Sequence, residues 1–164
     1  CENIARNLVR AVRFGGDLEA REGMSLGSLA AGLAFSMAGT AAVHALAYPL
    51  GGQFHVPHGA ANAVMLRPLL EFNLPACQER FARLAMAFGV AIPGDLQGSS
   101  EAFIRLVIDL SEKAGVKTHL RDLGIPRGAL STMADAAMEE VRLLENNPRA
   151  LTREDAERLY CAAW

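Results

Sequence analysis

No stretch of this sequence alternates apolar and polar residues in the way that a half-buried β-strand does. Apolar residues instead recur at helical spacing, as Ile4, Leu8 and Val12 do near the start of the chain. Glycine and proline interrupt this pattern at intervals, and such breaks usually separate one helix from the next. The sequence therefore predicts an all-α fold.

The expected helices follow from these breaks and from candidate capping residues. They cover residues 1–14, 18–37, 41–47, 59–72, 76–88, about 100–114, 127–144 and 152–164. Asp17 is a suitable N-cap for the second helix, and Ser99 or Ser100 for the sixth. The third should end at Tyr48-Pro49, because a residue before proline avoids the helical region. Residues 50–56 are then expected to form a loop.

Length and charge limit the class of protein. A chain of 164 residues predicts one domain over 1–164 with a sizeable core. Hydrophobic residues make up 51% and charged residues 21%, which is typical of a globular protein. The net charge of −2 provides no basic field for nucleic acid or an anionic membrane. We therefore expect neither as a partner.

The run from Met24 to Leu50 is apolar enough to approach transmembrane length. Glycine, serine and threonine dilute it, and His44 interrupts it. We expect a buried helix in a protein core.

The cysteines indicate the compartment. Cys1, Cys77 and Cys161 are far apart and form no Cys-x-x-Cys motif, which argues against a zinc ribbon or a redox pair. Free thiols suit a reducing environment, and no signal peptide is apparent. We expect a cytoplasmic protein.

Three of the four histidines, His44, His55 and His58, lie within twenty residues. Histidine is the commonest protein ligand for transition metals. His44 falls in an expected helix and His58 at the start of the next, so a turn between them could bring both to one point. A single histidine of this kind can also be a hydrogen-bonded core residue. The pair favours a metal site. His55 is expected to be a surface residue of the loop, and the alternative is that it lies near a bound cofactor or substrate.

The motifs around these histidines resemble a known family. They read Gly39-Thr40-Ala41-Ala42-Val43-His44, then Pro49-Leu50-Gly51, then Pro57-His58-Gly59-Ala60-Ala61-Asn62. This pattern resembles the signature of the iron-containing (group III) alcohol dehydrogenases, the family of lactaldehyde reductase. Residues 17–22, 32–36, 147–149 and 159–164 are similar to that family as well, so the resemblance covers essentially the whole chain.

The resemblance implies a fold and an activity. Members of the family are much longer, and this chain resembles their helical, bundle-like C-terminal metal-binding domain without the N-terminal nucleotide-binding domain. The implied reaction interconverts a small primary alcohol or 1,2-diol with its aldehyde or ketone. The implied cofactors are Fe²⁺ or Zn²⁺ and NAD(P), the latter bound through the N-terminal domain, which also supplies an Asp and a His to the metal. The full-length protein is expected to be a homodimer, and the isolated chain inactive.

The resemblance also implies roles for particular residues. His44 and His58 match the metal ligands. Tyr48 stands where many relatives have a third histidine near the nicotinamide, which implies a catalytic or cofactor contact; a packed aromatic is the alternative. Thr40 is implied to contact the cofactor or to lie at the pocket that holds the alcohol. Phe35 is implied to narrow the alcohol pocket, and core packing is its alternative.

Two other functions stay open. One is a metal-independent reductase domain of the maleylacetate reductase kind, although such relatives have Ala and His where this chain has Gly59 and Asn62. In this chain Gly59 and Asn62 are expected to shape the turn that orients the side chain of His58. The other function is a non-catalytic helical domain that packs against a partner. The metal content of the full-length gene product would separate the first hypothesis from both.

Overall fold

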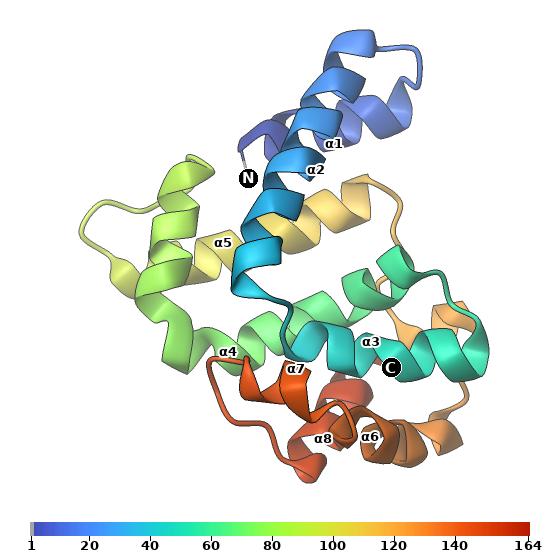
Figure 1. Ribbon diagram of the computed structural model, residues 1–164. Helices are drawn as coiled ribbons and strands as arrows, with labels where there is room; N and C mark the ends of the chain where they lie inside the picture. The colour runs from blue at the N-terminus through green and yellow to red at the C-terminus, as the bar shows by residue number, and fades with distance from the viewer. Residues whose placement is uncertain (1) are drawn as a thin grey trace. The chain divides into compact units, whose positions relative to one another are not determined.

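The computed structural model describes residues 2–164, and this part of the chain contains helices and turns but no strand (Figure 1). The α-helices are α1 (Glu2–Arg13), α2 (Leu18–Ala38), α3 (Ala42–Phe54), α4 (His58–Ala87), α5 (Leu96–Lys113), α6 (Leu130–Met138), α7 (Val141–Glu145) and α8 (Arg153–Ala163). Two short 3-10 helices, η1 (Leu120–Leu123) and η2 (Arg127–Ala129), lie between α5 and α6. The all-α prediction is confirmed.

The described residues group into two compact units. The first contains residues 2–39 and Cys77–Gly115, and the second contains Thr40–Ala76 and Val116–Trp164. Helix α4 contributes its first part to the second unit and its last part to the first. A single domain over 1–164 stays a prediction.

In the first unit, α1 and α2 pack closely because glycine faces the contact. A Cβ atom at Gly27 would lie 2.8 Å from Cγ1 of Ile4, which is closer than two carbon atoms can approach. Asp17 begins α2 as predicted, since its carboxylate accepts a hydrogen bond from the backbone N–H of Ala20 at 3.0 Å. A small-residue face of α2 therefore packs against α1.

The expectation of a buried helix is wrong for α2. Leu26, Leu29 and Leu33 keep 56%, 61% and 64% of their surface exposed. Among the residues of α2 only Ala20 and Gly27 are buried, because the face that packs against α1 is the one with small side chains. The expectation holds for α3, where six residues between Ala42 and Leu50 are buried.

Several predicted helix ends are also wrong. Helix α3 continues through Pro49 to Phe54, so the predicted loop at 50–56 is mostly helix. Proline removes one backbone donor and disfavours the preceding turn, but burial of Leu46, Pro49 and Leu50 in the core offsets that cost. In the same way, the two helices predicted at 59–72 and 76–88 form the single helix α4, which contains Pro68 and Pro75.

Two further boundaries differ from the prediction. Helix α5 begins at Leu96, and its N-cap is Asp95, whose side chain accepts from the N–H of Gly98 at 2.8 Å. Ser99 and Ser100 are buried inside that helix and bond to backbone groups instead. The helix predicted at 127–144 is divided into η2, α6 and α7.

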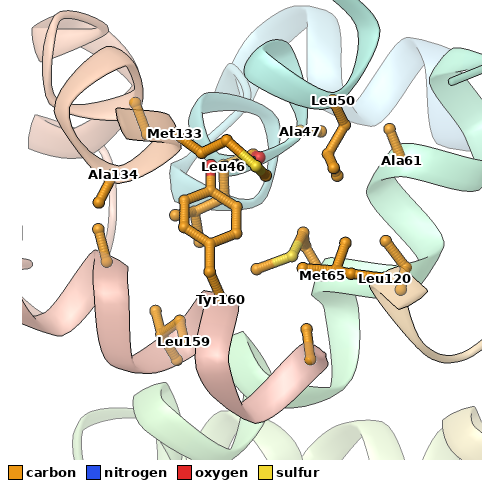
Figure 2. Close-up of a cluster of buried hydrophobic side chains, with 14 of the residues drawn as sticks. Leu46, Ala47, Leu50, Ala61, Met65, Leu120, Met133, Ala134, Leu159 and Tyr160 are labelled. Carbon is orange, nitrogen blue, oxygen red and sulfur yellow. Dashed lines mark hydrogen bonds between the residues drawn. The ribbon is translucent and has the colours of Figure 1, made fainter. Parts of the chain in front are cut away.

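The core of the second unit fixes α3 and the first part of α4. Figure 2 shows the ring of Tyr160, from α8, among Leu46, Met65 and Met133. The buried hydroxyl of Tyr160 donates a hydrogen bond of 2.7 Å to the backbone carbonyl of Leu46 in α3. This bond and the apolar contacts hold the helix on which His44 lies.

No helix within residues 2–164 is by itself long and apolar enough to span a bilayer; α2 and α3 meet the length and composition requirement only when taken together. Cys77 is buried and Cys161 is exposed, and both have free thiols. Cys1 lies outside the described residues.

Candidate metal centre

Two histidines from neighbouring helices come together in the second unit. His44 lies in the first turn of α3, and His58 is the first residue of α4. Between them the chain reverses at His55, which has a left-handed backbone conformation (φ 55°) and whose N–H bonds to the carbonyl of Gly51 at 3.1 Å. The ring centroids of His44 and His58 lie 5.3 Å apart, with the ring planes tilted by 48°.

The His44 imidazole has an unusual environment. Its Nδ1 atom is buried and has no hydrogen-bond partner within residues 2–164. Burial lowers the pKa of His44, and the neighbouring His58 lowers it further. His44 is therefore neutral at neutral pH, which is the protonation state that leaves a nitrogen lone pair for a metal ion.

Asn62 contacts the second histidine from one helical turn further along α4. Its Nδ2 atom donates to the backbone carbonyl of His58 at 3.0 Å and lies 3.1 Å from the Nε2 atom of the ring. The Oδ1 atom of Asn62 is buried and has no partner in the part of the chain that the structure describes. The sequence motif indicates Asn62 only as a residue that shapes a turn, although its i, i+4 spacing from His58 places both residues on one face of the helix.

The donor set fits part of a transition-metal site. Imidazole nitrogen suits iron and zinc, and each ligand nitrogen must lie about 2 Å from the ion. The short separation of the two rings is compatible with one shared ion. Among residues 2–164, however, no group of three His, Cys, Asp or Glu side chains gathers at one point. These residues therefore bring together two of the side chains that such a site needs.

The second unit contains two other predicted site residues, Thr40 and Tyr48, which precede and follow His44 in the sequence. Tyr48 follows one turn later on α3 and is 44% exposed, so its ring is not a core residue. Because α3 continues past Tyr48, this residue and His44 lie on the same face of the helix. Thr40 precedes α3, and its backbone carbonyl accepts a hydrogen bond of 3.0 Å from Asn146.

The remaining predicted site residue is Phe35, and the two other histidines of the chain are His55 and His119. Phe35 belongs to the first unit, on α2, and is 57% exposed. Phe35 is therefore not part of the core that the described residues form. His55 is exposed at the end of α3, as expected of a surface residue. His119 precedes η1, where its Nδ1 atom lies 3.2 Å from the hydroxyl of Thr118.

Comparison with known proteins identifies the family. The whole chain, residues 1–164, matches the model of the Fe-containing alcohol dehydrogenase family, C-terminal. The chain belongs to the Fe-containing alcohol dehydrogenase family. The family resemblance derived from the histidine motifs is thereby confirmed.

Individual proteins match over nearly the whole chain. It is 40% identical to 1,3-propanediol dehydrogenase of Citrobacter freundii over 155 residues, which is 94% of this chain and 40% of that protein. It is 37% identical to lactaldehyde reductase of Escherichia coli (strain K12), over 91% of this chain and 39% of that protein. The chain thus spans about two-fifths of the length of these relatives.

Solved structures of two dehydrogenases contain the same fold over part of their length. The crystal structure of a 1,3-propanediol oxidoreductase matches with a TM-score of 0.95 at 38% identity, covering 99% of this chain and 43% of that one. An alcohol dehydrogenase from Oenococcus oeni matches with a TM-score of 0.93 at 35% identity, again over 99% of this chain and 43% of that one.

Proposed function

We propose that this chain is the metal-binding part of an NAD(P)-dependent alcohol dehydrogenase. The reaction interconverts a small primary alcohol or 1,2-diol with the corresponding aldehyde or ketone. The observation on which the proposal rests is the paired imidazoles of His44 and His58, one with a buried nitrogen that lacks a partner within residues 2–164. The names of the relatives, a 1,3-propanediol dehydrogenase and a lactaldehyde reductase, support the substrate class.

His44 and His58 are the residues that would hold Fe²⁺ or Zn²⁺. Such an ion, when bound, polarises the oxygen of an alcohol or a carbonyl as a Lewis acid. The protein's part is to hold the two imidazoles in place, and burial of His44 lowers its pKa and so favours its neutral form. The NAD(P) that exchanges the hydride would be bound by a part of the protein outside residues 1–164.

Tyr48 and Thr40 are proposed to contact the cofactor, and Phe35 to narrow the alcohol pocket. The partly exposed ring of Tyr48, on the same face of α3 as His44, can present its hydroxyl to a bound molecule. A phenol can donate one hydrogen bond to an oxygen or an amide of that molecule. We also propose that the full-length protein is a homodimer in the cytoplasm, the free thiols of Cys77 and Cys161 being suited to a reducing compartment.

The experiment compares three variants of the full-length protein by steady-state kinetics with a short 1,2-diol. His58→Ala should lower kcat/KM by at least about 100-fold, because the ligand of a Lewis-acidic ion is worth several kcal/mol. Tyr48→Phe removes one hydroxyl, worth about 0.5–1.5 kcal/mol, so its loss should cost about tenfold or less. His119→Ala is the matched control, since it also removes a histidine, but one whose ring contacts Thr118 and is not part of the His44–His58 pair.

Two results would contradict this assignment. If Tyr48→Phe were as damaging as His58→Ala, the tyrosine would be a catalytic acid and the ion would not be the main electrophile. Activity of His58→Ala equal to that of the His119→Ala control would exclude the metal-dependent reaction and favour a metal-independent reductase.

A further inference from the structure

We propose that Asn62 is a positioning residue, which holds the imidazole of His58 by packing its side-chain amide against the face of the ring. In this arrangement both ring nitrogens keep their in-plane positions free, one for a proton and one for a metal ion. The part of the inference that concerns metal rests on the proposed function.

The distances from the amide determine where it lies. The Nδ2 atom of Asn62 is 3.1 Å from Nε2 of His58 and 3.4 Å from Nδ1. These two nitrogens lie on either side of the Cε1 carbon, and their in-plane directions diverge. An amide nitrogen in the ring plane at nearly equal distances from both would overlap Cε1. It must therefore lie above or below the plane, where an N–H group can point at the π-electrons.

A backbone hydrogen bond determines which end of the amide faces the ring. Nδ2 donates to the carbonyl oxygen of His58 at 3.0 Å. With the amide rotated by half a turn, Oδ1 would take that place, and two acceptor oxygens would face each other. The N–H₂ end is therefore the one over the ring.

The other end of the amide has no partner among the described residues. Oδ1 of Asn62 is buried and bonds to nothing within residues 2–164. Buried polar atoms are usually paired, and a lone acceptor costs free energy. The Oδ1 atom of Asn62 thus accepts no hydrogen bond from these residues, whereas the Nδ2 atom contacts both the ring and the backbone carbonyl of His58. This is expected if its position is determined by the ring.

His58 needs such a support. It is exposed and lies at the first position of α4, where the backbone of a preceding turn does not restrict the side chain. The only ring that packs against it among the described residues is His44. Restricting the imidazole before metal arrives reduces the entropy lost on binding, and residues that orient a ligand histidine typically change metal affinity about 10–100-fold.

The first test measures zinc affinity by titration calorimetry into the metal-free, full-length protein. Asn62→Leu keeps the size of the side chain and removes the N–H₂ group, and Asn62→Ala removes both. Each should weaken zinc binding about 10–100-fold. The matched control is Ser111→Ala, which removes a hydrogen bond of the same i→i−4 type from Ser111 to the carbonyl of Val107 in α5. Zinc affinities of both Asn62 variants within about twofold of the control would overturn the proposal.

The second test needs no metal. A proton above an imidazole ring is shifted upfield by the ring current, so the side-chain amide protons of Asn62 should resonate upfield of ordinary asparagine protons in metal-free protein. His58→Ala should return them to the ordinary range. Amide protons at ordinary shifts in the wild type would overturn the proposal, even where Asn62→Ala fails to fold. Equal zinc affinity of the wild type and His58→Ala would instead contradict the proposed function, while the amide shift would still report the packing.

Discussion

At the scale of single residues, His44 combines a buried ring nitrogen with a lowered pKa. Burial is the larger cause, because removing the ring from water penalises the charged imidazolium. The charge of His58 is the second cause. Both effects favour the neutral imidazole, which is the form that binds a metal ion, and both lower the stability of the folded chain in acid.

A dependence of stability on pH follows from this lowered pKa. The unfolded chain binds a proton at His44 near the ordinary pKa of about 6.5, whereas the folded chain binds it only at lower pH. Between these two pKa values the unfolded state holds more protons, so the free energy of unfolding falls as pH falls. Urea unfolding of metal-free protein between about pH 8 and about pH 5.5 should show this loss.

His44→Asn should lose less stability than the wild type over the same pH range, since asparagine does not titrate. His119→Asn is the control and should behave as the wild type does. The same pH dependence in His44→Asn and in the wild type would show that His44 does not take up its proton at a lower pH in the folded protein.

At the scale of elements, glycine in α2 determines how closely α1 can approach. A Cβ atom added at Gly27 would lie only 2.8 Å from the side chain of Ile4, whereas the nearest atom to a Cβ added at Gly32 would be Cε1 of Phe35 at 4.0 Å. The two glycines belong to one helix but differ in the space around them.

Gly27→Ala and Gly32→Ala should therefore differ in stability. Both gain up to about 1 kcal/mol from the higher helix propensity of alanine, so this gain cancels in the comparison. Only Gly27→Ala forces Ile4 to move, and overpacking of this kind costs about 1–3 kcal/mol. Chemical denaturation should show Gly27→Ala less stable than Gly32→Ala by that amount. Equal stabilities would mean that α1 can shift away without cost.

At the scale of the whole molecule, this chain matches about two-fifths of each relative, and residues 2–164 bring together only two candidate ligands. An ion held by two imidazoles keeps most of its water, and affinity for metals rises with the number of ligands that the fold places in advance. We therefore expect tight metal binding to need more of the protein than residues 1–164.

The expected result is weak metal binding by the 164-residue chain and tight binding by the full-length protein. Calorimetric titration of both with zinc would measure the difference, and a His44→Ala, His58→Ala double variant of the full-length protein is the control that removes the pair. Equal affinity of the shorter chain and the full-length protein would show that the remaining chain supplies no ligand.

The sequence by itself determined the fold class, the family and the two histidines of the candidate site. Helical periodicity and capping by Asp17 are local properties, because interactions within one or two turns decide them. The motifs that contain His44 and His58 are present in the sequence itself. The motif around His58 also contained Asn62, but the sequence alone does not show that its amide lies over the ring.

Only the tertiary structure decided where helices end and which faces are buried. The sequence predicts helix ends at Pro49 and before Pro75, yet burial of neighbouring apolar side chains offsets the lost hydrogen bonds. Its apolar pattern predicts a buried α2, but the glycine face of that helix packs against α1 and leaves the leucines exposed.

The meeting of the two imidazoles is also a tertiary property. It depends on the chain reversal at His55 and on the hydrogen bond from Tyr160 to Leu46, which joins residues 114 positions apart. Contacts over such separations depend on the packing of the whole unit, which periodicity and spacing do not encode.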